Sequence, residues 1–139
     1  MIDPAGEGTK GPVKKITSFE DLRIWQNAVE LAKDIYILTG RPEFKTDFGL
    51  KDQMRRAAVS ISTNIAEGFE RRSRKEYLNF LNISKGSCGE LRSLLMISKE
   101  VGYLSEADLE EYRQRARLIS GSIANHMKAI ARVPDKYGK

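Results

Sequence analysis

Cys88 and His126 are the residues best suited to nucleophilic or acid–base chemistry, and each is the only residue of its type in the 139-residue chain. A single cysteine excludes an internal disulfide and a zinc site made of several cysteines. A cysteine nucleophile needs a base within hydrogen-bonding reach. In a helical hairpin that turns near Tyr103, the two side chains would be offset along the helix axis by about eight residues, or roughly 12 Å. We therefore predict no dyad, with Cys88 a small buried hydrophobe and His126 a hydrogen-bonded residue at the edge of the core.

Other patterns that support catalysis or cofactor binding are missing from the sequence. Di-iron bundles need Glu-x-x-His pairs on facing helices, and the chain contains none. The segment Lys85–Gly89 holds two glycines but lacks the strand and the spacing of a phosphate-binding loop. We predict instead that these glycines allow close helix packing. The sequence thus indicates no catalytic residues, no metal site and no cofactor.

Four segments with helical periodicity predict four helices, at about residues 18–39, 48–67, 73–101 and 105–133. Serine caps mark the starts of the first, third and fourth helices. Gly68 is predicted to end the second helix as its C′ residue. The buried stripe predicted for the first helix consists of Phe19, Leu22, Trp25, Val29, Ala32 and Tyr36, with Ile35 beside it.

Short connections between long helices favour antiparallel neighbours, so we predict an all-α, up-down-up-down four-helix bundle. The bundle is expected over residues 17–133, between a disordered arm at residues 1–16 and a tail at residues 134–139. The last two helices are the longer pair, so their hairpin should project and leave apolar surface for self-association. No apolar run is long enough for a membrane span, and the single cysteine suits a reducing cytoplasm.

Small side chains fill the second helix from Ala57 to Thr63, which indicates a crowded bundle centre or a subunit contact. A ligand cleft is the alternative interpretation. Asn64 lies on the apolar side of this helix, and because a buried amide needs hydrogen bonds, we predict that it fixes helix register. Glu67 lies in the last turn, where the helix dipole disfavours a carboxylate, so we expect an arginine of the next loop to pair with it.

Charge is distributed unevenly along the predicted bundle, although the chain as a whole carries only +5. One end gathers the loop after Gly68 and both chain termini, and its basic residues are Lys10, Lys14, Lys15, Arg71, Arg72, Arg74, Lys75, Lys128, Arg132, Lys136 and Lys139. The opposite end is acidic. Around the middle, seven of eight basic residues are arginine, the side chain suited to phosphate groups. A polyanion partner is one interpretation, and ordinary solvated helix faces are the other.

Several blocks of the sequence resemble the bacterial four-helix-bundle family of 23S rRNA intervening-sequence proteins. They are Phe19–Gln26, Phe48–Leu50, Gln53–Ile61, Asn64–Gly68 and Gly102–Leu104, in the expected order within residues 17–132. The resemblance implies a four-helix bundle that assembles as a ring-like homopentamer, and it supplies no catalytic residues. A more distant resemblance is to the accessory protein of diversity-generating retroelements, a basic pentamer that associates with a reverse transcriptase and with nucleic acid.

Charge and resemblance together predict a non-enzymatic, oligomeric bundle that binds RNA or a nucleic-acid complex through a basic surface. The candidate contacts lie on the second helix, the loop after it, the start of the third helix and the fourth helix: Arg55, Arg56, Arg71, Arg72, Arg74, Lys75, Arg113 and Arg117. The alternative is a protein-interaction scaffold, or an accessory subunit of a nucleic-acid enzyme such as a reverse transcriptase, with no RNA contact of its own.

Overall fold

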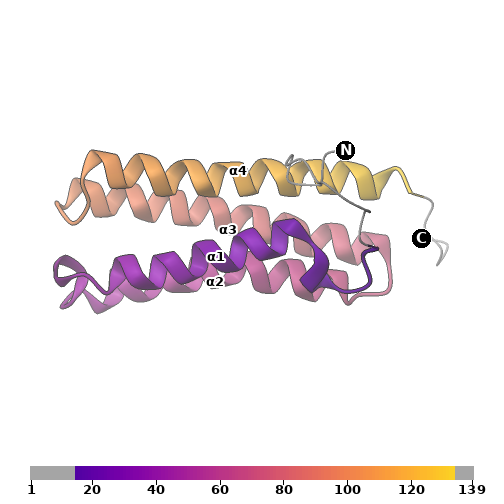
Figure 1. Ribbon diagram of the computed structural model, residues 1–139, viewed down its shortest axis with the longest axis horizontal. Helices are drawn as coiled ribbons and strands as arrows, with labels where there is room; N and C mark the ends of the chain where they lie inside the picture. The colour runs from indigo at the N-terminus through magenta and orange to yellow at the C-terminus, as the bar shows by residue number, and fades with distance from the viewer. Residues whose placement is uncertain (1–14, 134–139) are drawn as a thin grey trace.

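The computed structural model describes residues 15–133, and the regular structure in this range is helical. The four long helices are α1 (Arg23–Thr39), α2 (Phe48–Phe69), α3 (Arg74–Glu100) and α4 (Glu106–Ala131), with short 3-10 helices η1 (Phe19–Asp21) and η2 (Pro42–Phe44). The helices alternate in direction and pack in chain order, so that α1 contacts α2 far more than it contacts α4 (Figure 1). The predicted all-α bundle with sequential packing is confirmed, while residues 1–14 and 134–139 of the predicted arm and tail lie outside the described residues.

Serine caps fix the starts of α3 and α4 because each hydroxyl accepts a backbone N–H that has no partner inside the helix. Ser73 Oγ accepts from Glu76 N at 3.1 Å, and Ser105 Oγ accepts from Asp108 N at 3.0 Å. Ser18 forms a full capping box with Asp21, but this box opens η1 rather than α1. The backbone is extended at Leu22, and α1 begins only at Arg23.

The break at Leu22 changes which side of α1 faces the core. The buried positions are Ile24, Ala28, Leu31, Ala32, Ile35, Leu38 and Thr39. The predicted stripe is therefore wrong at Val29 and Tyr36, whose side chains are 39% and 46% exposed. The predicted stripe follows a helix that is continuous from Ser18; because α1 begins only after the extended Leu22, its buried face lies roughly one position earlier.

Gly68 lies inside α2, not beyond its end, so its prediction as a C′ residue is wrong. A Cβ atom at this position would lie 2.7 Å from Phe80 Cβ and 3.2 Å from the Tyr77 carbonyl oxygen. Glycine is therefore required here because α2 and α3 approach each other too closely for any side chain.

The two glycines of α3 behave in the opposite way. Nothing lies within 4 Å of a Cβ built on Gly86, and one built on Gly89 meets only Arg92 Nη2 at 3.9 Å. The prediction that they permit close packing between helices is wrong for the described chain. Gly86 is exposed on the outer side of α3.

The α3–α4 hairpin turns at Gly102, the one described glycine with a positive φ, at 90°. Tyr103 N donates to Ser98 O at 2.8 Å and Gly102 N donates to Lys99 O at 3.0 Å, which is a Schellman motif. The Tyr103 hydroxyl then donates to Asp47 Oδ2 at 3.0 Å, and its ring meets the buried Phe44 edge-on. Both helical hairpins are therefore joined at this end of the bundle.

At the other end, α3 and α4 extend beyond the first residues of α1, as the helix lengths predict (Figure 1). Within residues 15–133, no helix has the length and apolar character needed to cross a membrane.

Candidate nucleic-acid interface

The α2–α3 loop, the start of η1 and the last turn of α4 lie together at one end of the bundle (Figure 1). Arg74 joins two of these segments, since its Nη1 donates to Val133 O and, at 3.5 Å, to Ala131 O. We call this end the basic pole and define it by its described basic residues: Lys15, Arg71, Arg72, Arg74, Lys75, Lys128 and Arg132. The predicted convergence of these segments is confirmed, while Lys10, Lys14, Lys136 and Lys139 lie outside the described residues.

Two arginines of the basic pole are engaged in structural contacts. Arg71 Nη2 pairs with Glu67 Oε2 at 2.9 Å, and its guanidinium carbon lies 4.9 Å from the centre of the Phe80 ring. This is the arginine partner expected for Glu67. Arg74 satisfies carbonyl groups at the end of α4, where the helix dipole favours a cation.

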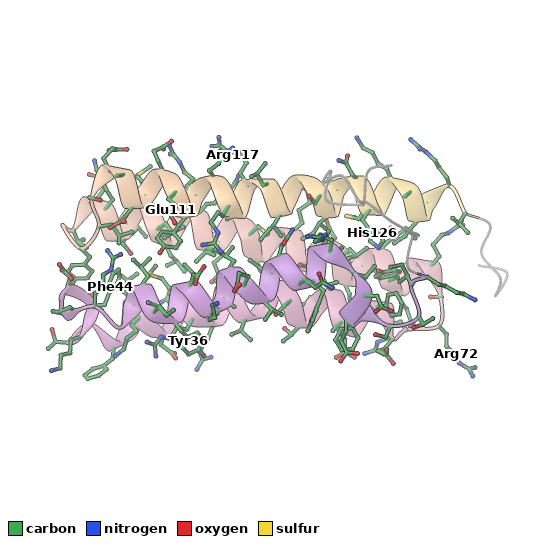
Figure 2. All side chains as sticks on the ribbon, viewed as in Figure 1. Tyr36, Phe44, Arg72, Glu111, Arg117 and His126 are labelled. Carbon is green, nitrogen blue, oxygen red and sulfur yellow. The ribbon has the colours of Figure 1, made fainter. Side chains whose placement is uncertain are left out.

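Arg72 and Lys75 are two of the accessible cations of the pole, and the exposed Lys15, Lys128 and Arg132 are the others. Arg72 and Lys75 are both exposed, and neither has a hydrogen-bond or ion-pair partner among residues 15–133. Figure 2 shows the Arg72 side chain extending away from the end of the bundle. Their charge is thus available to an external anion, with the exposed Glu70 and Glu76 as nearby acidic neighbours in the chain.

Arg55 and Arg56 lie elsewhere, on α2 beside α1. Arg55 Nε donates to Thr39 Oγ1 at 2.8 Å and its Nη2 donates to Tyr36 O at 3.2 Å, so it caps the end of α1. Arg56 is exposed and pairs with Asp52 at 2.9 Å. Arg55 is therefore a structural residue in part, a role that its position in the sequence does not reveal.

Arg113 and Arg117 lie on α4. Arg113 pairs with Glu110 one turn earlier. Arg117 is exposed, has no partner among the described residues, and points outward on the side of the bundle opposite Tyr36 (Figure 2). The eight predicted contacts therefore do not form one continuous surface, because they fall into a pole group, an α2 pair and an α4 pair.

Ion pairs connect α1 and the loop after it to α4 in the acidic half of the bundle, where α1 and α4 have few other contacts. Arg115 Nη1 lies 2.8 Å from Asp34 Oδ2, and both side chains are 29% exposed. Arg41 Nη1 lies 2.7 Å from Asp108 Oδ2, and this hydrogen bond raises the pKa of the arginine. These basic residues are occupied by internal carboxylates, as Arg71 is at the basic pole, whereas Arg72 and Lys75 of the pole are not.

Hydroxyl groups link α2 to α3. Ser60 Oγ and Ser87 Oγ are 2.8 Å apart, and the buried Ser84 Oγ donates to Ile61 O at 2.7 Å. Asn64 Nδ2 donates to Ser60 O at 2.8 Å and to Ser60 Oγ at 2.9 Å, so its contacts stay within α2 and reach α3 through Ser60. A direct role for Asn64 in helix register stays a prediction.

Cys88 and His126, the two residues suited to chemistry, lie far from each other. His126 Nε2 lies 2.8 Å from the Tyr77 hydroxyl, as expected for a hydrogen-bonded residue at the core edge. Tyr77 is three turns away from Cys88 along α3, or roughly 16 Å. Burial raises the pKa of the Cys88 thiol to about 11 and lowers the pKa of His126. Neither a thiolate nor an imidazolium is favoured, and no cluster of three metal-ligating side chains occurs within residues 15–133.

A groove runs along α1 and α2. Val59, Ser60 and Thr63 line part of it, within the small-residue segment for which a ligand cleft is the alternative interpretation of the sequence, but its aromatic rings are not predicted. The groove contains the exposed aromatic rings of Tyr36 and Phe48 together with Lys51, Arg55 and Arg56, and we call it the α1–α2 groove. The sequence predicts Tyr36 in the core because the predicted apolar stripe of α1 is off by one position. Phe48 is the first residue of α2, directly after the capping Asp47, and a first-turn position of this kind could have signalled its exposure.

Taken together, these contacts define an antiparallel helical bundle with a cationic end and without an assembled catalytic group in its described part. The chain belongs to the 23S rRNA-intervening sequence protein family, whose model matches residues 20–125. The family resemblance inferred from the sequence blocks is thereby confirmed.

A solved structure has the same fold. It is the crystal structure of a protein of unknown function from the S23 ribosomal protein family of Bacteroides thetaiotaomicron. The TM-score is 0.70 at 22% sequence identity, over 76% of this chain and 98% of that one. No curated protein matches the chain, and the more distant resemblance to the retroelement accessory protein stays a prediction.

Proposed function

We propose that this protein binds RNA through its basic pole, as a homo-oligomer and without catalytic activity. The observation that carries the proposal is the convergence of the α2–α3 loop with the end of α4, which gathers cations that are distant in the chain. Phosphate contacts from Arg72 and Lys75 supply the affinity, since these two residues are exposed and have no acidic partner within residues 15–133. Family membership supports the same function but does not by itself establish it.

Filter binding with a structured RNA hairpin tests the proposal, using the full chain at low and at moderate salt. Arg72→Glu is expected to weaken binding strongly, because it both removes a phosphate contact and introduces repulsion. Lys45→Glu is the matched control, since Lys45 is also exposed but lies in the acidic half, and the substitution changes the net charge by the same amount. Binding that is undetectable, insensitive to salt, or equally weakened by both variants rejects the proposal.

Self-association is part of the proposal and is supported by the outer faces of α3 and α4. These faces expose Ile83, Ile97, Val101 and Leu118, each at least 45% exposed in the single chain. Apolar surface of this kind is typical of subunit contacts. The number of subunits, five, comes from the family resemblance alone, and light scattering on the purified chain measures it.

The second candidate is an accessory subunit that contacts a nucleic-acid enzyme, such as a reverse transcriptase, rather than RNA. It is favoured by the internal engagement of Arg71 and Arg74, which leaves fewer cations for phosphate groups. Arg72→Glu discriminates the two, because it strongly weakens RNA binding under the first function and leaves enzyme binding intact under the second.

A further inference from the structure

The α1–α2 groove consists of two adjoining hollows of about 390 and 410 Å³. One is lined by Phe48 and Lys51, and the other by Tyr36 and Arg56. Asp52 and Arg55 line both, so the hollows share a boundary. Each hollow therefore offers one aromatic ring, and a guanidinium lies between the two.

Both rings are open to solvent, and a cationic side chain lies over each of them. Phe48 is 70% exposed, and Lys51 Nζ lies 5.0 Å from the centre of its ring. Tyr36 is 46% exposed, and the Arg55 guanidinium carbon lies 4.5 Å from its ring centre. Exposed aromatic rings beside cations are the usual platform for unpaired bases, because every base can stack on a ring while its phosphate meets the cation.

The charge of the groove favours an anionic occupant. Three cations, Lys51, Arg55 and Arg56, face one carboxylate within the hollows, and that carboxylate, Asp52, already accepts from Arg56 Nε. The neighbouring Asp47 is occupied at both oxygens, by Leu50 N and by the Tyr103 hydroxyl. Arg55 uses Nε and Nη2 for contacts to α1, and its Nη1 donates to no acceptor among residues 15–133.

We propose that the α1–α2 groove binds unpaired nucleotides of RNA, with one base on Phe48, another on Tyr36, and backbone phosphate at Arg55 and Lys51. This inference rests on the proposed function and deepens it. The basic pole contacts phosphate groups of any RNA, whereas the groove requires bases that are free to leave a duplex.

Two fluorescent RNA probes test the groove on the full chain: a twelve-nucleotide oligouridine and a duplex of the same length. Tyr36→Ala and Phe48→Ala are each expected to weaken binding of the single strand about tenfold, as loss of one stacked base does, and to leave duplex binding unchanged. Tyr36→Phe is the matched control and retains single-strand affinity, since the ring remains. Arg72→Glu weakens binding of both probes.

The outcomes separate this inference from the proposed function. If neither probe binds, both fail. If both probes bind the wild-type chain and Tyr36→Ala and Phe48→Ala leave single-strand affinity unchanged, the groove proposal alone fails. Sedimentation of the same variants gives a further check: an altered number of subunits would mean that the groove is a contact between copies of this chain, which also overturns the proposal.

Discussion

Tyr77 and His126 show how burial decides the protonation state of a side chain. The tyrosine hydroxyl bonds His126 Nε2 across α3 and α4, and the tyrosine ring also meets Phe69 and the imidazole edge-on. Burial disfavours a charge at both positions, so it raises the pKa of Tyr77 and lowers the pKa of His126. The pair thus joins two helices as neutral groups beside the basic pole.

Stability is expected to fall with acid in a window set by His126. Its pKa is 6.5 when unfolded and lower when folded, so the unfolded state binds more protons as the pH drops through 6.5. The stabilisation is complete above that pH and is lost progressively toward the lower, folded pKa. Urea unfolding at about pH 7.5 and 5.5 measures it. Because the chain has one histidine, His126→Gln should flatten this dependence; an equally steep dependence in the variant would assign it to other groups.

At the level of the helices, the sequence predicts their extents and order well, but it predicts poorly which residues contact a neighbouring helix. Ser73, Ser105 and the Gly102 turn are local signals, and each is found where it was expected. The phase of α1 is predicted wrongly although the sequence carries the correct stripe, since Ile24, Leu31 and Leu38 recur every seven residues on the buried face. The sequence does not reveal that Gly68 faces a closely packed helix and Gly86 faces open space, because only the distance to the neighbouring helix distinguishes them.

Alanine substitution at these two glycines should therefore have opposite effects. Gly68→Ala places Cβ against Phe80 and should destabilise the fold by about 1–3 kcal/mol through overpacking. Gly86→Ala meets open space and should stabilise it by about 1 kcal/mol, since alanine is the better helix former. Denaturant unfolding measures both. A neutral Gly68→Ala variant would show that α2 and α3 can separate at low cost.

The ion pairs between α1 and α4 are expected to contribute little. Asp34 and Arg115 are partly exposed, so a double-mutant cycle with alanine should give a coupling of about 0.2–1 kcal/mol. Screening should reduce it further at high salt. A larger coupling that resists salt would mean that this contact, rather than the α2–α3 interface, holds the bundle together.

At the scale of the whole molecule, topology places like charges together that the chain keeps apart. The antiparallel order of the helices was predictable from short loops, and the position of the basic pole followed from it. The availability of each cation was not predictable, because it depends on side-chain partners: Arg71 and Arg74 are engaged, whereas Arg72 and Lys75 are not. The aromatic part of the α1–α2 groove is not predicted for another reason, because the predicted phase of α1 places Tyr36 in the core.

The salt dependence of RNA affinity tests the role of the basic pole most directly. For an RNA hairpin, the slope of the logarithm of the binding constant against the logarithm of salt concentration counts phosphate contacts. With Arg72 and Lys75 both changed to alanine, we predict a slope shallower by about two units, one for each lost contact. An unchanged slope in this double variant would contradict RNA binding at the basic pole.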